Sequence, residues 1–471
     1  MVSYFYFLHK EVAMKKICLF VLAASFLSIL IMGCARNEPW RTTTLPQDCD
    51  NNPEACGTAI WEEHTGYKLA FIEFTERGNV FSNEHAQAVY DRLWDLSKKP
   101  QPLAIMVFVH GWKHNANTKD GNVISFRHAL KNLGESGVLG LRQLVGIYIG
   151  WRGLSVHGLG SENLSYWDRK AVAQEVGKGG VSEVFIELEK IDRSNSRNYL
   201  FIVGHSFGGA ITLSALNEIF LERLKTAHGN VDVPLRAFGE GTVIINPAIE
   251  ANQILQLKES SMALGGADPY QPSLLHVLSS RGDSATHTVF PIGQALGVGL
   301  TWNQHDLQRK YKSKDYSLSE YDLDTTTVGN YIPFHTAALL DLEDISEPES
   351  QKLFKKFKVA LDRKAAPTLG QWIIHSYCSE PQVSEADQTE YFPCEDNEAV
   401  SFVYTTDSFI KDHNDVFNDN VMAYFSTLVS EAIFKQDQTR YFPNCAKEGQ
   451  FLFESCFNYH LERYKGLKDA F

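Results

Sequence analysis

The sequence predicts an α/β protein in which a mostly parallel sheet is flanked by helices on both faces. Short apolar runs typical of buried strands alternate with amphipathic helical patterns from residue 67 onward. A repeated strand-helix order makes successive strands parallel, because each helix crosses back over the sheet. A glycine-containing turn at 204–208 joins one of these strands to the helix that follows it. Such turns lie at the sheet edge where α/β proteins bind ligands.

Each expected strand is an apolar or β-branched run, and each expected helix carries apolar residues three or four positions apart. The expected strands cover 68–74, 103–109, 144–149, 199–203, 242–245, 274–279 and 399–404. The expected helices cover 84–97, 123–133, 169–191, 209–224 and 421–434. A chain of 471 residues has room for one large domain with insertions or for two domains, and the pattern favours one domain over 67–471.

Composition and charge narrow the class of partner. Hydrophobic residues make up 44% and charged residues 21% of the chain, as in globular proteins generally. The net charge is -13, and no basic stripe is present to neutralise phosphates. We therefore expect no nucleic-acid partner.

The first 33 residues read as an export signal of the Sec type. Lys15 and Lys16 precede an apolar run over 17–32, which is short for a membrane span but fits the apolar part of a secretory signal. Met14 is an alternative start, because the residues before it are an unusual extension of a signal. An uncleaved membrane anchor is the alternative to a signal.

The residues Ile-Met-Gly-Cys at 31–34 resemble the lipobox of bacterial lipoproteins. The resemblance implies cleavage before Cys34, a lipid anchor on its side chain and a location in the cell envelope. Ala35 after the cysteine resembles an outer-membrane sorting signal of Gram-negative lipoproteins. The polar, unpatterned stretch 36–66 reads as a tether between lipid and fold, so residues 34–66 form the anchor segment.

Six cysteines remain after Cys18 of the signal and Cys34 are set aside, which agrees with export to an oxidising compartment. They form three pairs that are close in sequence: Cys49 with Cys56, Cys378 with Cys394, and Cys445 with Cys456. Six cysteines allow about 15 connectivities, so these disulfides are a preference for close partners. No Cys-x-x-Cys or histidine spacing indicates a zinc site, and we expect no metal.

Ser206 lies at the apex of the turn Gly204-His205-Ser206-Phe207-Gly208. A serine between a strand and a helix is held with its hydroxyl exposed beside the helix N-terminus. At Gly204 and Gly208 a Cβ would crowd the neighbouring backbone. The pattern therefore indicates a nucleophilic serine.

The strand 103–109 is followed by His110, Gly111 and Trp112. Together with the Gly-His-Ser-Phe-Gly turn, this Val-His-Gly-Trp sequence resembles the α/β-hydrolase family. The resemblance implies an oxyanion hole made by the backbone amides of Phe207 and Trp112. We expect His110 to order this loop and not to transfer protons.

A serine nucleophile needs an acid and a histidine, and the family order is serine, acid, histidine. Asp283 follows the strand 274–279 and is the expected acid, with Glu250 as the alternative. His413 lies between the last expected strand and the last expected helix, which is the family's position for the catalytic base. His335 is the alternative base, because it also follows Asp283.

The stretch between acid and base is longer than a minimal hydrolase needs, so we expect an insertion over 288–398. Insertions above the carboxyl ends of strands usually shape a pocket, and a cap is favoured over a decoration of the sheet edge.

The expected activity is that of a serine hydrolase that cleaves carboxylic esters through an acyl-serine intermediate, without a cofactor. The substrate would be a small-molecule or lipid ester, and the membrane a partner through the lipid anchor. Thioesterase, amidase or acyltransferase chemistry on the same residues is the alternative, as is an inactive envelope protein that binds a partner.

Overall fold

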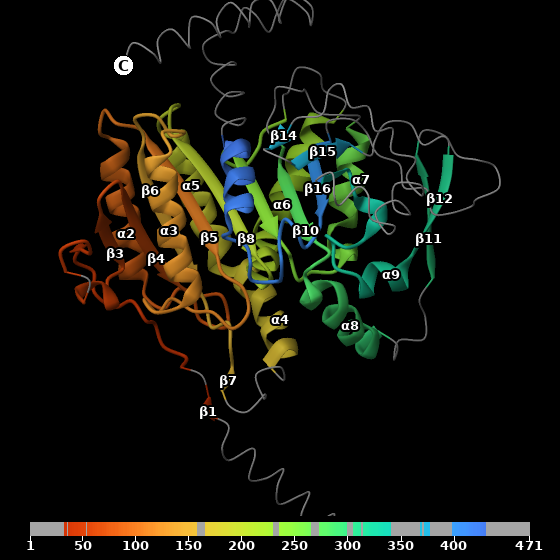
Figure 1. The fold of residues 1–471 in the computed structure, drawn as a ribbon, viewed down its shortest axis with the longest axis horizontal. Helices are drawn as coiled ribbons and strands as arrows, with labels where there is room; N and C mark the ends of the chain where they lie inside the picture. Colours follow the sequence, from red (N-terminus) through yellow and green to blue (C-terminus); the bar gives the residue numbers. More distant parts are fainter. Residues whose placement is uncertain are drawn as a thin grey trace, which may run out of the picture.

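A computed structural model describes residues 33–34, 36–52, 54–157, 165–228, 235–264, 273–298, 305–311, 314–340, 368–369, 372–376 and 398–429. Its centre is one large mixed sheet, in the order β14-β15-β13-β16-β10-β9-β8-β5-β6-β4-β3-β2 (Figure 1). The strands are β2 (Gln47–Asp48), β3 (Trp61–His64), β4 (Tyr67–Glu73), β5 (Leu103–Val109), β6 (Gln143–Gly150), β8 (Tyr199–His205), β9 (Gly241–Ile245), β10 (Leu275–Ser280), β13 (Ala337–Leu340), β14 (Thr368–Leu369), β15 (Trp372–Ser376) and β16 (Val400–Thr405).

From β13 across to β4 every neighbouring pair of strands is parallel. Antiparallel pairs flank this parallel region, with β3 next to β4 on one side and β15 next to β13 on the other. Two small two-stranded antiparallel sheets lie outside it: β1 (Gly33–Cys34) with β7 (Val156–His157), and β11 (Asp306–Tyr311) with β12 (Lys314–Ser319).

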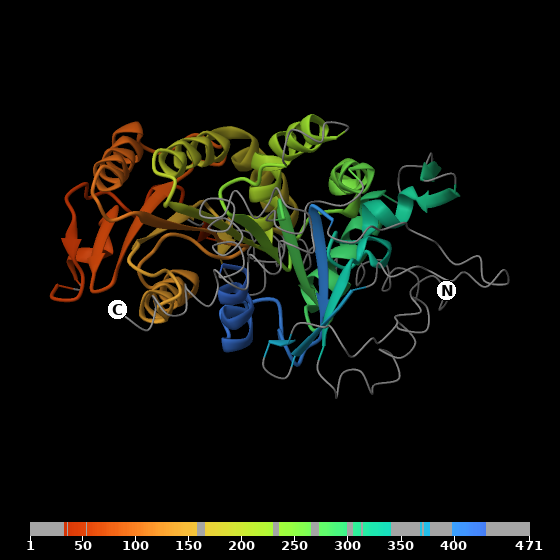
Figure 2. The same ribbon diagram turned by 90° about the horizontal axis from the view of Figure 1, so that it is seen from above.

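Helices cover both faces of the sheet, so the predicted α/β architecture is confirmed (Figure 2). The helices are α2 (Asn83–Ser97), α3 (Gly121–Glu135), α4 (Ser165–Val176), α5 (Ser182–Arg193), α6 (Phe207–Ala227), α7 (Leu255–Ala263), α8 (Phe290–Val298), α9 (Glu320–Thr325) and a helix over 419–429. Figure 2 shows α2, α5 and α6 on one side and α3 with the helix 419–429 on the other.

The core is split by the sheet into two hydrophobic clusters. Along β8, Leu200 and Ile202 belong to the cluster under α5 and α6, whereas Tyr199 and Phe201 belong to the cluster under α3. All four side chains are at most 3% exposed. This period-two alternation follows from the pleat of a strand that is buried on both faces.

The single helix expected over 169–191 is two helices. Gly179 has non-helical backbone angles, φ -88° and ψ -131°, between α4 and α5. The amide of Gly180 donates to the carbonyl of Gly78 at 2.7 Å, and a Cβ at position 180 would lie 2.7 Å from the same oxygen. The break therefore comes from a close contact with a distant loop.

The stretch 36–66 is packed onto the fold and is not the loose tether that its composition suggested. Cys49 and Cys56 form the predicted disulfide, and both are buried. Strand β3 pairs with β4, and Arg41 is 1% exposed. Long-range pairing and burial order this segment despite its polar composition.

The described parts of the predicted insertion 288–398 lie in two places. Strand β13 pairs with β16 and β15 pairs with β13, so this part lengthens the sheet. Helix α8 lies instead beside α4, at the edge where the parallel strands end (Figure 1).

Among the described residues no helix is both long and apolar enough to span a membrane.

Candidate active site

The site lies where two loops leave the carboxyl edge of the sheet in opposite directions. Strand β5 lies between β6 and β8, and the helices that follow β5 and β8, namely α3 and α6, cover opposite faces (Figure 2). A crevice forms between diverging loops of this kind, and α/β proteins bind ligands there. Ser206 follows β8 directly and therefore lies at this point.

Ser206 has a left-handed backbone conformation, with φ 56° and ψ -122°. Such angles are unfavourable for a residue with a side chain and persist only where the surroundings enforce them. Here the turn is enforced by close packing, because a Cβ at Gly208 would lie 2.0 Å from the carbonyl oxygen of Val109. Gly208 is thus required by the neighbouring strand β5, and Gly204 by α6, where a Cβ would lie 2.6 Å from Thr212 Oγ1.

His413 connects the predicted nucleophile to the predicted acid. Its Nε2 lies 2.8 Å from Ser206 Oγ, and its Nδ1 lies 2.8 Å from Asp283 Oδ2. The three residues come from the loops after β8, β10 and β16, and β10 and β16 are neighbours in the sheet. Adjacent parallel strands therefore bring residues that are far apart in sequence to one edge.

Asp283 is fully buried and keeps its charge through hydrogen bonds. Its Oδ1 accepts from the amides of Ala285 (2.9 Å) and Thr286 (3.2 Å), and its Oδ2 accepts from the Thr286 hydroxyl at 2.5 Å. Burial opposes ionisation, but the hydrogen bonds from His413 and Thr286 outweigh it and lower the pKa of Asp283 below its usual value. A carboxylate with these partners is also held in one orientation.

The loop that precedes Trp112 packs directly against the serine. A Cβ at Gly111 would lie 2.7 Å from Ser206 Cβ, so only glycine fits this close approach. Phe207 is the first residue of α6, and its N–H is one of the four that have no partner within a helix. Both residues that were predicted to supply oxyanion-hole amides thus flank Ser206.

His110 joins the loop after β5 to the loop after β6. The Trp151 amide donates to its Nε2 at 3.1 Å, and its Nδ1 therefore carries the proton and donates to the Gly111 carbonyl at 2.9 Å. Burial lowers the pKa of His110 to about 4, so the ring is neutral. This arrangement orders the loop, as expected for this residue.

The two alternative residues lie in other contacts. The Nε2 of His335 bonds the Gly329 carbonyl at 2.9 Å, and burial lowers the pKa of His335 to about 4. Glu250 pairs with Lys170 and accepts a hydrogen bond from Gln294. The structure therefore brings Asp283 and His413, and neither alternative, to the serine.

Sequence reasoning missed His205, the residue before the serine. Its Nε2 lies 2.7 Å from the backbone carbonyl of His413, and since a carbonyl only accepts, Nε2 donates. Burial keeps the pKa of His205 well below its usual value, so the ring is neutral. The residue ties the loop of His413 to the turn of Ser206, and only its place in the motif hinted at a role.

An aromatic cluster includes both candidate oxyanion residues. Tyr166 contacts the rings of Phe207 (5.2 Å between centroids), Trp112 (5.6 Å) and Phe290 (6.3 Å). These rings come from α4, α6, α8 and the loop after β5. Phe207 and Phe290 are fully buried, so the cluster packs these elements together beside Ser206.

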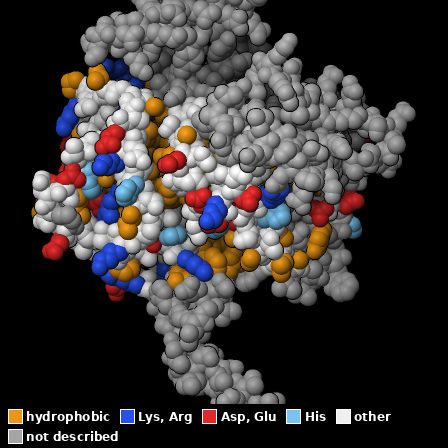
Figure 3. Space-filling view, viewed as in Figure 1, with side chains coloured by type: hydrophobic (Ala, Val, Ile, Leu, Met, Phe, Trp, Pro, Cys, Tyr) orange, Lys and Arg blue, Asp and Glu red, His pale blue; other side chains and the backbone are white. Residues whose placement is uncertain are grey.

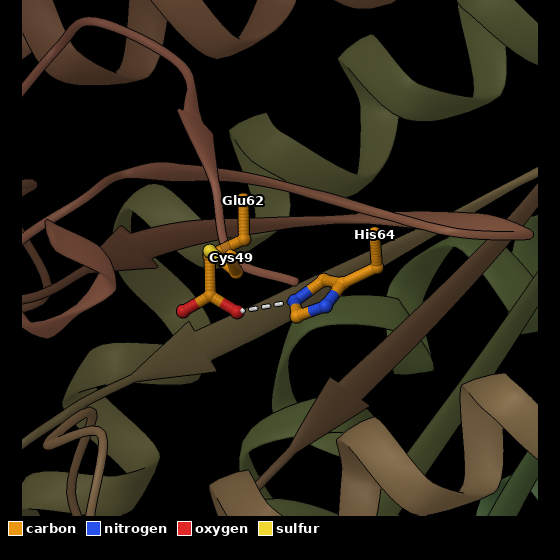
Figure 4. Close-up of side chains that lie close together, drawn as sticks. All are labelled: Cys49, Glu62 and His64. Carbon is orange, nitrogen blue, oxygen red and sulfur yellow. Dashed lines mark hydrogen bonds and ion pairs between the residues drawn. The ribbon is translucent and has the colours of Figure 1, made fainter. Parts of the chain in front are cut away.

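One group of metal-ligating side chains is close together in the described part of the chain, namely Cys49, Glu62 and His64 (Figure 4). The sulfur of Cys49 is bonded to Cys56 and offers no thiolate. Glu62 pairs with Arg41 at 2.8 Å and with Arg127 at 2.5 Å, and bonds His64 at 3.0 Å. The group is therefore an ion-pair network around a disulfide.

No known family model, curated protein or solved structure matches this chain. Four cysteines of the predicted disulfides lie outside the described residues: Cys378, Cys394, Cys445 and Cys456.

Proposed function

We propose that this chain is a serine hydrolase with an α/β-hydrolase fold that cleaves carboxylic esters through an acyl-serine intermediate. The observation that carries the proposal is the unbroken series of hydrogen bonds from Ser206 Oγ through His413 to Asp283. A nucleophile bonded to a base that a carboxylate orients is the arrangement that activates a hydroxyl. The strained turn at Ser206 and its place at the carboxyl edge of the sheet support the same reading.

In the first half of the reaction His413 Nε2 takes the proton of Ser206 as Oγ attacks the carbonyl carbon of the ester. The bond from that carbon to the alcohol oxygen then breaks, and His413 gives its proton to the departing alcohol. In the second half water attacks the acyl-serine, His413 takes a proton from the water, and returns it to Ser206 as the acid leaves.

Asp283 has two roles in this scheme. Its bond to Nδ1 fixes the ring so that Nε2 faces the serine, and its charge stabilises the imidazolium that forms. The lowered pKa keeps this carboxylate ionised throughout the neutral pH range. The negative oxygen that develops on the substrate would be bound by the amides of Phe207 and Trp112.

The N-terminal sequence supports placing this enzyme in the cell envelope. The Cys49–Cys56 disulfide is formed, and structural disulfides persist in oxidising compartments. A lipid on Cys34 would attach the chain to a membrane. The proposal therefore includes export and anchoring, because of the disulfide and of the lipobox-like sequence at residues 31–34.

Active-site labelling tests the proposal. The full chain is treated with a fluorophosphonate probe, and the adduct is mapped by mass spectrometry. We expect one adduct on Ser206 that is lost in Ser206→Ala and in His413→Ala. His287→Ala is the matched control, because this exposed histidine lies four residues from Asp283 and should leave labelling unchanged. Well-folded protein that takes up no probe would refute the proposal.

A further inference from the structure

The N-terminal attachment point lies at the same edge of the fold as the candidate active site. Strand β1 pairs with β7, with Gly33 opposite His157 and Cys34 opposite Val156. Strand β7 follows the carboxyl end of β6, and β6, β5 and β8 are parallel, so their carboxyl ends share one edge with Ser206. Figure 1 shows β1 and β7 along the lower edge, together with α4 and α8.

This pairing limits how the chain can lie on a membrane. A flexible stretch of some thirty residues after a lipid would allow any face to reach the bilayer. Here β1 pairs with β7 at Cys34, and six residues later the amides of Trp40 and Arg41 donate to Glu73 at the end of β4. An acylated Cys34 and an uncleaved apolar run over 17–32 both lead to this edge, so the consequence is the same for either anchor.

The same edge carries exposed aliphatic side chains. Val289 and Ile292 are 57% and 61% exposed, and they lie three positions apart where α8 begins, on one face of the helical turn. They follow the loop of Asp283 in the chain. Figure 3 shows hydrophobic side chains gathered along this lower edge, where Figure 1 places α8. Apolar side chains beside charged ones suit the boundary between headgroups and acyl chains.

A hollow on this edge is lined by the basic side chains of Arg36, Lys113 and Arg152, and Arg152 pairs with Glu76 at 2.7 Å. The hollow also contains Glu38, which pairs with Arg36 at 3.4 Å, and Glu73, whose carboxylate accepts the amides of residues 40 and 41. Lys113 directly follows Trp112, and its Nζ lies 4.4 Å from the centre of the Trp112 ring, so a lipid headgroup bound at this end of the hollow would lie close to one of the two candidate oxyanion residues. A surface that carries charges of both signs suits the headgroup region of a bilayer.

We infer that the carboxyl edge of the sheet faces the membrane and that the substrate is an acyl ester of a membrane lipid. The substrate class rests on the proposed hydrolase function, whereas the orientation rests on β1, β7 and the exposed face of α8. Two separate measurements therefore test the two parts.

Orientation is tested with an environment-sensitive fluorophore on the full chain in vesicles of phosphatidylethanolamine and phosphatidylglycerol. The probe is attached at Ile292→Cys and, in a matched variant, at Leu141→Cys. Leu141 is 87% exposed and lies just before β6, at the opposite edge of the sheet. We expect a blue shift and quenching by brominated lipids at position 292 and neither at 141. Equal responses at both positions would overturn the inference.

Substrate class is tested by comparing hydrolysis of vesicle phosphatidylglycerol with hydrolysis of dissolved p-nitrophenyl butyrate. We expect Ile292→Asp to lower the vesicle rate about tenfold and to leave the soluble rate unchanged, and Leu141→Asp to change neither. Equal loss of both rates, or loss of neither, would overturn the substrate assignment. If the unsubstituted chain cleaves neither ester, the proposed function itself fails, and the fluorophore still decides the orientation.

Discussion

Two regions of this molecule place a histidine between two oxygen-bearing side chains, and the partners differ. His413 lies between the carboxylate of Asp283 and the hydroxyl of Ser206. His64 lies between two carboxylates, with Nδ1 at 3.0 Å from Asp50 and Nε2 at 3.0 Å from Glu62. The first arrangement can pass a proton from a hydroxyl to the ring, whereas the second contains no hydroxyl to activate.

The surroundings reinforce this difference. Glu62 also bonds two arginines, so every atom of its carboxylate is used inside the fold. The series at Ser206 instead ends on a hydroxyl that lies beside the first amide of a helix. A histidine bonded to a carboxylate can therefore activate a nucleophile where its other nitrogen faces a hydroxyl, and only stabilises the fold where that nitrogen faces a second carboxylate. The predictions below change one region at a time.

The largest expected effect is on activity in Asp283→Asn. Because Oδ1 accepts two backbone amides, the asparagine oxygen would take that place and its NH2 group would face Nδ1 of His413. The ring would then adopt the wrong tautomer and the imidazolium would lose its counter-charge, so kcat/KM should fall by about 10⁴-fold. Ester hydrolysis measured at neutral pH checks this. Glu250→Gln is the matched control and should retain activity, because Glu250 pairs with Lys170 away from His413. Similar losses in both variants would remove Asp283 from its proposed role.

At the other region, Glu62→Gln should lower the free energy of unfolding by about 3 kcal/mol, because the buried Arg41 and the half-buried Arg127 lose this counter-charge. Activity per folded molecule should stay within about twofold, since the network does not contact the triad. Chemical denaturation measures the free energy of unfolding. Titration with a fluorophosphonate counts the active sites, so that the hydrolysis rate can be expressed per folded molecule. A loss of activity without a loss of stability would contradict this division.

The same residue gives a pH dependence. Burial opposes the charge of Glu62, but hydrogen bonds from His64 and Arg127 outweigh it and lower the pKa from 4.5 to about 2. A lowered folded-state pKa means that this stabilisation is complete above about pH 4.5 and is lost as the pH falls toward 2. Unfolding measured across this range should show a slope that Glu62→Gln reduces. An unchanged slope in the variant would assign the acid sensitivity to other carboxylates.

A smaller effect is expected when the neighbouring disulfide is removed in Cys49→Ser with Cys56→Ser. The bridge closes a short loop with a sequence separation of 7, so its loss should cost about 2 kcal/mol of unfolding free energy. Dithiothreitol should destabilise the unsubstituted chain more than it destabilises this variant. Equal sensitivity of both proteins to the reductant would show that another bridge matters more.

How far the sequence predicts these two regions depends on the range of their interactions. Strands β5 and β8 were predicted well because burial on both faces leaves continuous apolar runs. The order of Ser206, Asp283 and His413 along the chain also selected the residues that meet in space. The local sequence pattern was sufficient wherever a buried strand and the turn after it determine where a residue lies.

Composition failed where distant residues decide the structure. The polar segment around Trp61–His64 is a strand because it pairs with β4. Glu62 is buried there because its carboxylate pairs with Arg127, which is 65 residues away in the sequence. The break at Gly179 likewise reflects contact with Gly78. Hydrophobic periodicity contains no term for such contacts, and it therefore suggested a tether and an unbroken helix.

The smallest expected effect is on kcat in variants of His205, a residue that we expect to position His413 and not to react with the substrate. The bond from its Nε2 to the His413 carbonyl joins residues 208 positions apart and fixes the loop of the proposed base. Without it, His205→Ala should lower kcat about tenfold with little change in KM, because the base is less well placed while substrate contacts remain. His205→Gln can still donate a hydrogen bond and should recover part of kcat. A loss of stability alone, with kcat per labelled site unchanged in both variants, would show that His205 only fills space; recovery in the glutamine variant would show that the bond itself orients His413.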